Sequence, residues 1–191
     1  TAANNTAVGH TALVANSSGH SNVAVGYNAL DALTTASKTV AVRANAGGSL
    51  TTGENSVAIG YDALATETTL SGKVAVGYQA LRLSTGNYNT GVGYAAGANL
   101  GTGTSNTAIG HWALTNATTG LNNTTVGRSA GAQITTGDSN VAVGYQALDA
   151  NTTADGNTAV GSDALGANTT GHSNTAIGKD SLKLNVDGDR N

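Results

Sequence analysis

Aromatic side chains recur at one fixed place in this sequence, directly after a short apolar segment that ends in glycine. Five of them are tyrosines, and histidine takes the same place in two further copies. Rings repeated at a constant interval suit contact with sugars or with a protein receptor, because they combine a large apolar area with a polar tip. The single tryptophan, beside one of the histidines, is a further candidate. The predicted contact ladder comprises Tyr27, Tyr61, Tyr78, Tyr94, His111, Trp112 and Tyr145.

The same rings have a simpler structural interpretation. Stacked along one edge, they would cover a turn and shield its hydrogen bonds from water. We favour this interpretation for the column as a whole and keep receptor contact as the sharper hypothesis. Trp112 is the better pointer to a contact because it occurs only once in a repetitive chain.

Catalysis, by contrast, finds no support in the sequence. The eleven acidic residues form no recurring pair, the four histidines lack a metal-ligand spacing such as HExxH, and there is no cysteine. We therefore predict that the protein is not an enzyme and has no catalytic, cofactor-binding or metal-binding residues. A net charge of −3 is too weak to indicate nucleic acid, and no apolar run is long enough for membrane insertion.

An internal repeat generates this aromatic column. One glycine closes each copy, and copies follow at 17 residues, except for 16 between Gly77 and Gly93, giving eleven copies in all. A fixed short period predicts a solenoid in which each copy is one coil. Positions below are counted from these residues, with Arg43 in the one place that lacks glycine: Gly9, Gly26, Arg43, Gly60, Gly77, Gly93, Gly110, Gly127, Gly144, Gly161 and Gly178.

The three residues before each glycine predict a short strand. Position −3 is Thr or Val, position −2 is usually Ala, and position −1 is always Val or Ile. Alternation puts positions −1 and −3 on one face and position −2 on the other. We assign the branched face to the core, through Val8, Val25, Val42, Ile59, Val76, Val92, Ile109, Val126, Val143, Val160 and Ile177.

The second half of the repeat supplies larger core residues. Position +4 is leucine in eight copies, and the other three have glycine there with Leu50, Leu100 or Ile134 three residues later. We interpret this as two interchangeable loop conformations that fill one core slot. A following Thr-Thr-Gly predicts a turn with positive φ at the glycine, so each coil would run strand, turn, strand, turn. The predicted core leucines are Leu13, Leu30, Leu64, Leu81, Leu114, Leu148, Leu165 and Leu182.

Polar positions complete the expected organisation. Asparagine fills position −4 in eight copies and predicts a hydrogen-bonded ladder. We assign residues 1–178 to the solenoid array. We assign the charged residues 179–191 to a cap or to a transition into a following segment. We expect the whole sequence to be a fragment of a longer chain. The apolar core is thin and the Ala-rich face allows close approach, so we predict a homo-oligomer and favour three chains around an axis.

The repeated phrase also resembles a known family. NSVAIG at 55–60, SNVAVG at 21–26 and 139–144, and NTAIG at 106–110 are similar to the head repeats of trimeric autotransporter adhesins of the YadA type. NVAVGYQALDANTT at 140–153 and KVAVGYQAL at 73–81 resemble repeats of phage-type tail fibres. The resemblance covers essentially the whole chain, although the coil is longer than in those heads. It implies a left-handed parallel β-roll assembled as a homotrimer.

These observations predict a structural or adhesive fibre segment, either an adhesin head or a tail-fibre shaft. Its expected place is extracellular, on a cell surface or a virion-like particle, and its expected partners are copies of itself and a glycan or protein receptor on a host. One alternative is a purely architectural filament or spacer without a receptor. Another is an ice-binding solenoid, which we rank lower because Thr at −3 shares its face with Val or Ile at −1, as expected of a core edge rather than a Thr array.

Overall fold

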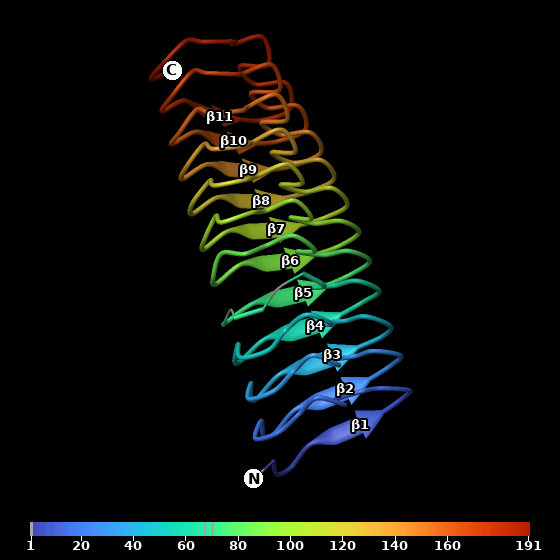
Figure 1. Cartoon of the computed structure of the whole chain (residues 1–191). Helices are drawn as coiled ribbons and strands as arrows, with labels where there is room; N and C mark the ends of the chain where they lie inside the picture. The colour runs from blue at the N-terminus through green and yellow to red at the C-terminus, as the bar shows by residue number, and fades with distance from the viewer. Residues whose placement is uncertain (1, 67, 70) are drawn as a thin grey trace.

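Eleven short parallel strands form a single sheet in this computed structural model, one strand for each copy of the repeat (Figure 1). The structure describes residues 2–66, 68–69 and 71–191, and these residues contain no helix. The predicted all-β parallel solenoid is thereby confirmed. The strands are β1 (Thr6–Val8), β2 (Val23–Val25), β3 (Val40–Val42), β4 (Val57–Ile59), β5 (Val74–Val76), β6 (Thr90–Val92), β7 (Thr107–Ile109), β8 (Thr124–Val126), β9 (Val141–Val143), β10 (Thr158–Val160) and β11 (Thr175–Ile177).

Each strand pairs with the next at equivalent positions of the repeat, so alike residues stack along the array. Ala142 of β9 lies opposite Ala159 of β10, for example. The 16-residue copy keeps this register, because Val74 still pairs with Thr90. The turn between position +7 and the following strand is therefore one residue shorter in this copy, and the strand ladder is undisturbed.

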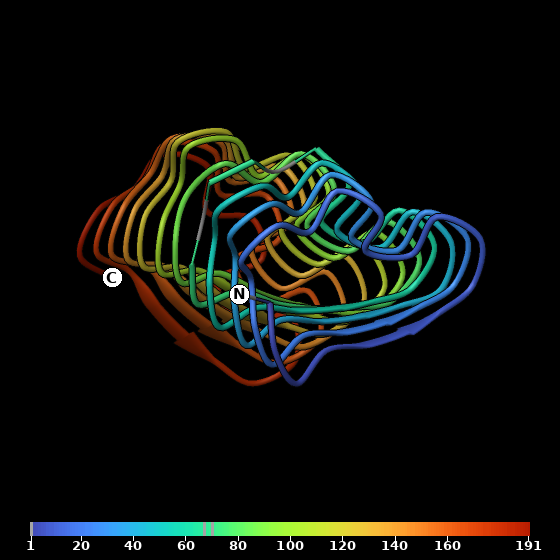
Figure 2. The same ribbon diagram turned by 60° about the horizontal axis from the view of Figure 1, so that its bottom comes forward.

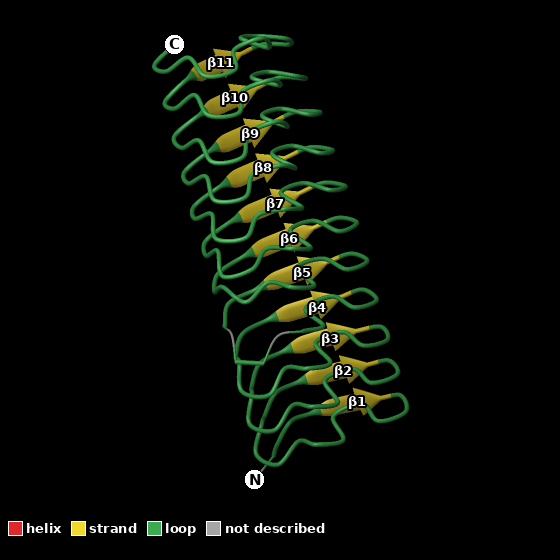
Figure 3. Cartoon of the chain, turned by 45° about the horizontal axis from the view of Figure 1, so that its top comes forward, coloured by secondary structure: helices red, strands yellow, loops and turns green. Residues whose placement is uncertain are grey.

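The prediction of two strands per coil is wrong. Among the described residues each coil has one strand, and turns form the rest of its outline (Figures 2 and 3). The turns still bond coil to coil, as when the N–H of Leu114 donates to the carbonyl of Ala130 at 3.0 Å. A second strand is prevented by left-handed backbone at positions +2 and +4, where Trp112 has φ of 58° and Leu114 has 49°.

The small residues of each strand, and not the branched ones, face the interior. From β2 to β11, position −2 is buried in every strand, with Ala24, Ala41 and Ala142 fully so. The predicted core role of position −1 is therefore wrong, since every one of these side chains is half-buried or exposed: Val8, Val25, Val42, Ile59, Val76, Val92, Ile109, Val126, Val143, Val160 and Ile177.

The cause is the thinness of the coil. Alanines at positions −2 and +3 and the leucine at +4 fill the interior between strand and turns. A Cβ atom added to Gly91, in position −2 of β6, would lie 2.8 Å from Cγ of Leu81. Branched side chains at this depth would overpack the interior, so the strand turns them outward.

The leucines at position +4 are buried as predicted, with one exception. Seven are 0–9% exposed, whereas Leu182 in the last coil is 36% exposed. The alternative residues Leu50, Leu100 and Ile134 are also buried, and Cδ1 of Ile134 lies 2.9 Å from where a side chain of Gly131 would begin. The shared core slot is confirmed, but φ at +4 is about the same in both kinds of coil, 58° at Gly131 and 49° at Leu114. The exchange is thus one of side chains, not of two conformations at that residue.

The asparagines at position −4 form the predicted ladder. Asn106 is buried, and its Nδ2 donates to the carbonyl of Gly120 at 2.8 Å. Its Oδ1 accepts the backbone N–H of Asn123, the same position one coil later, at 2.9 Å. Lys73 takes the asparagine's place in one coil, where it too is buried and its Nζ donates to the carbonyl of Ser84 at 2.5 Å.

Glycine in the Thr-Thr-Gly segment serves a different purpose from the one predicted. Gly120, Gly137 and Gly171 are not among the positive-φ residues. A Cβ on Gly120 would instead lie 2.6 Å from the carbonyl oxygen of Gly137 in the next coil. Close approach of neighbouring coils, and not backbone conformation, excludes a side chain there.

The charged segment 179–191 continues the winding of the array. The N–H of Thr175 donates to the carbonyl of Asn191 at 2.8 Å, and Asn191 Nδ2 donates to Oδ1 of Asn174 at 3.0 Å. Lys183 pairs with Asp180 at 2.8 Å and with Asp163 of the preceding coil at 3.6 Å. The last residues therefore extend both the backbone ladder and the asparagine ladder.

Candidate functional site

Three surfaces follow the stacking direction of the solenoid and present repeated side chains. The aromatic edge comprises the rings at position +1. The lateral groove lies among positions +2, +5 and +6 on the turn side. The branched face is the outer side of the sheet, formed by positions −1 and −3. Each is a consequence of the in-register stacking, which turns one position of the repeat into a column.

The aromatic edge stacks as predicted. Tyr61, Tyr78 and Tyr94 follow one another with ring centroids 5.6 and 5.0 Å apart and planes inclined by 12°, and His111 continues the stack at 5.2 Å. His10 and Tyr27 form a second stack at 5.5 Å. The rings therefore cover one another's faces and leave their edges to solvent.

Other members of the predicted contact ladder lie outside these stacks. Ala44 interrupts the column between Tyr27 and Tyr61. The guanidinium of Arg128 lies over the ring of Tyr145, 5.7 Å from its centroid. Trp112 is at position +2, beside the column, and its ring is tilted by 46° from that of His111 at 4.3 Å. Trp112 thus contacts the end of the stack through His111 without joining it, and its side chain also borders a hollow in the lateral groove.

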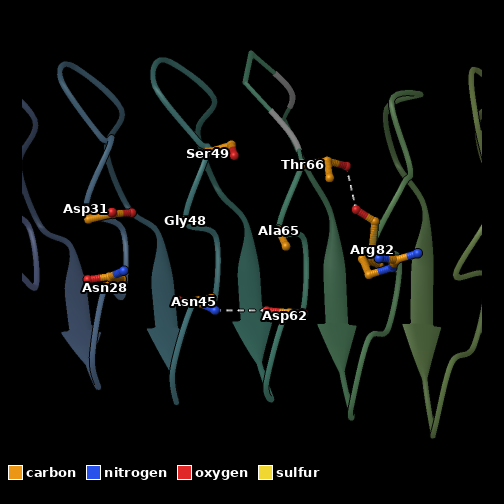
Figure 4. Close-up of a pocket in the computed structure, with 9 residues that line it drawn as sticks. All are labelled: Asn28, Asp31, Asn45, Gly48, Ser49, Asp62, Ala65, Thr66 and Arg82. Atoms are coloured by element: carbon orange, nitrogen blue, oxygen red, sulfur yellow. Dashed lines mark hydrogen bonds between the residues drawn. The ribbon is translucent and has the colours of Figure 1, made fainter.

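Three hollows lie in a row along the lateral groove. The largest, about 380 Å³, is bordered by Asn28, Asp31, Asn45, Asp62 and Arg82 among others (Figure 4). Within it Nδ2 of Asn45 donates to Oδ1 of Asp62 at 3.1 Å, and Oγ1 of Thr66 donates to the carbonyl of Arg82 at 2.6 Å. Asn45, Asp62 and Thr66 are thus engaged in hydrogen bonds between coils, whereas the buried Nε of Arg82 has no hydrogen-bond partner among the described residues.

The second hollow, about 240 Å³, surrounds Trp112. Thr115, Asn116, Ser129, Ala132, Gln133 and Asp149 complete its lining. A column of amides runs past it, since Nδ2 of Asn99 donates to Oδ1 of Asn116, and Nδ2 of Asn116 donates to Oε1 of Gln133, each at 3.4 Å. The hollow therefore combines an indole, side-chain amides and a carboxylate.

Asp149 joins this hollow to the third, of about 200 Å³, which also contains Gln146, Asp163 and Lys183. Burial raises the pKa of Asp149 above its ordinary value. A hydrogen bond from Gln146 at 3.5 Å lowers this pKa, and the charge of Asp163 raises it. Sequence reasoning singled out Trp112 but missed Asn116, Gln133 and Asp149. Aligning positions +5 and +6 between copies would have placed them in neighbouring columns.

The branched face is the most apolar of the three surfaces. In its middle Ile59 and Ile109 are 37% and 38% exposed, and the valines at the other −1 positions between β2 and β10 are half-buried. Threonine or valine at position −3 continues the surface on every strand. This surface is the solvent-facing side of the sheet and not the core edge that the sequence predicted.

Among the described residues, no group of three or more His, Asp or Glu residues gathers in a way that could hold a metal ion. The described residues also contain no helix suited to crossing a membrane. No protein-family model, no curated protein and no solved structure matches the chain.

Proposed function

We propose that this chain is a segment of an extracellular fibre, either an adhesin head or a tail-fibre shaft, that assembles as a left-handed homotrimeric β-roll and displays binding surface. It acts by contact and carries no enzyme activity. The observation that supports this proposal best is the branched face. A contiguous column of Val, Ile and Thr on the outer side of the sheet supports an interface, because isolated soluble proteins rarely leave such patches open.

Three copies can bury this face around a common axis. The coil interior is filled mainly by alanine and one larger side chain per coil, so the single chain has little apolar area of its own to bury. Outward Val and Ile supply the missing area once copies meet. The aromatic edge and the lateral groove, which lie on other sides of the coil, then stay open for contact with a partner.

Light scattering on the purified chain tests the assembly directly. We expect the mass of three copies, and we expect Val126→Glu combined with Val143→Glu to convert the trimer into monomer, since charges on the branched face would be buried unpaired. Asn99→Glu combined with Gln133→Glu, on the groove side, is the matched control and should stay trimeric. A stable wild-type monomer would refute the trimeric assembly.

Ice binding is a second candidate, and one observation favours it. The sequence predicts Thr at −3 for a core edge, whereas Thr107, Thr158 and Thr175 are half-buried or exposed on the outer side of the sheet. Five of the eleven −3 positions are valine, however, and −1 is never threonine. Thermal hysteresis by a monomeric chain, abolished by Thr107→Lys and Thr124→Lys, would establish this function in place of the fibre.

A further inference from the structure

We propose that the hollow around Trp112 binds one unit of a neutral hexopyranose oligosaccharide, whose chain continues along the lateral groove past Asp149. The inference gives the proposed contact function a ligand class, and it rests on that function while being independent of the trimer. Four features of the hollow support it: a half-exposed indole at its border, a column of amides, a shared carboxylate, and the direction of the groove.

Trp112 is about as exposed as the tyrosines, but unlike them it borders one of the three hollows. Its neighbours in the same column are Ala95 and Ser129, so no ring covers it from the adjacent coils, and the tilt of His111 prevents parallel stacking. The side chain is 45% exposed and borders the hollow. The C–H groups on one side of a pyranose ring form a flat apolar patch that packs against such an indole.

The amides beside Trp112 provide donors and acceptors for sugar hydroxyls. A side-chain amide carries two N–H donors and a carbonyl with two lone pairs. The column from Asn99 through Asn116 to Gln133 uses only one N–H of each donor in its 3.4 Å bonds. The remaining N–H groups of Asn116 and the amide nitrogen of Gln133 are available to a hydroxyl, which both donates and accepts.

The charged groups favour a neutral sugar. Asp149 borders both the Trp112 hollow and its neighbour, and its carboxylate can accept hydrogen bonds from adjacent hydroxyls. Asp163 adds a second carboxylate nearby, compensated by Lys183 at 3.6 Å. An acidic polysaccharide would bring negative charge toward Asp149, and the Trp112 hollow itself contains no cation to balance it.

The groove also has the right direction and repeat for a chain of sugars. The two hollows follow each other along the stack and share Asp149. Coils succeed each other at about 4.8 Å, the spacing of neighbouring strands, which is comparable to the length of one sugar unit. Each step along an oligosaccharide therefore meets a further coil with its own polar side chains.

Trp112 is the only tryptophan, so its fluorescence reports on this hollow alone. We would titrate the full chain with cellohexaose, maltohexaose and the hexamer of N-acetylglucosamine. A saturable change of the emission with at least one of them is expected. Gln133→Ala and Asp149→Asn should each weaken that binding about tenfold, as expected for a lost hydrogen bond in the bound state. Gln79→Ala, the same substitution at position +2 of another coil, should leave the affinity for the sugar unchanged.

Calorimetry on Trp112→Ala extends the test to the indole, and we expect no measurable heat of binding. The proposal is overturned if none of the three sugars changes the emission. A fourth titration uses polygalacturonic acid, an acidic polysaccharide. The proposal is equally overturned if only this polymer changes the emission and added salt abolishes the change. Light scattering on the same samples separates this outcome from failure of the proposed fibre, because a trimer that binds no sugar refutes only the ligand class.

Discussion

The amide of Asn123 connects three coils, accepting from the backbone N–H of Asn140 at 2.9 Å and donating to the carbonyl of Gly137 at 2.8 Å and to Oδ1 of Asn106 at 3.2 Å. Asn123→Ala would leave a buried N–H and a buried carbonyl without partners. We expect a loss of about 1–3 kcal/mol in the free energy of unfolding, measured by chemical denaturation. Asn99→Ala removes an exposed amide and should cost less than about 0.5 kcal/mol. Equal losses would show that the ladder contributes no special stability.

Arg43 is the one residue other than glycine at position 0, and its φ of 97° lies where side chains are strained. Arg43→Gly should therefore stabilise the protein, by about 1–3 kcal/mol. Arg128→Gly, at position +1 in another coil, removes the same side chain without relieving such strain and should not stabilise. Thermal unfolding of both variants provides the measurement. A lower melting temperature for Arg43→Gly would contradict the strain argument.

Leu114 and Leu182 occupy the same position of the repeat in very different surroundings. Leu114 is fully buried between neighbouring coils, whereas Leu182 is 36% exposed in the last coil. Leu114→Ala should lower the free energy of unfolding by about 2–5 kcal/mol, and Leu182→Ala by less than half as much. Chemical denaturation of the two variants compares them, and similar losses would mean that the core slot is not uniformly packed.

Two aspartates should affect the pH dependence of stability in opposite directions. The pKa of Asp149 is raised in the folded state, chiefly by burial, so its ionisation opposes folding above that pKa. Asp149→Asn should thus be at least as stable as wild type at neutral pH, with any advantage vanishing as the pH falls below the ordinary value of 3.8.

The pKa of Asp180 is lowered, chiefly by its hydrogen bond from Lys183. Its contribution to stability is present above the ordinary pKa and is lost as the pH falls through the lowered one. Asp180→Asn should therefore be less stable than wild type at neutral pH and equal to it in acid. Melting curves across acid and neutral pH check both signs, and a common trend for the two variants would contradict this assignment.

The period of the repeat was sufficient to predict the strands, the buried leucines and the asparagine ladder. Each depends only on stacking equal positions, as Asn106 on Asn123. Which face of the sheet points into the coil was not predictable in the same way. Alternation assigns Ala142 and Val143 to opposite faces but does not say which face is inside, and the usual preference for larger side chains fails in so thin a coil.

The second side of the coil was mispredicted for a backbone reason. Leucine gives no signal for left-handed φ, yet Leu114 and its equivalents adopt it. The only hint was glycine at the same position, as in Gly97 and Gly131. Stacking equal positions places Asn116, Gln133 and Asp149 in neighbouring columns, but it does not predict that they enclose a hollow with Trp112, because this depends on side-chain directions around the turns.

The 16-residue coil shows where this array absorbs a change of length. One residue is missing between Ser84 and Gly86, and β5 and β6 remain paired as if nothing had changed. The same turn in other coils is thus a natural insertion point for a foreign peptide. Peptides placed there in chosen coils would be held at heights set by the coil spacing, as marks along a molecular ruler.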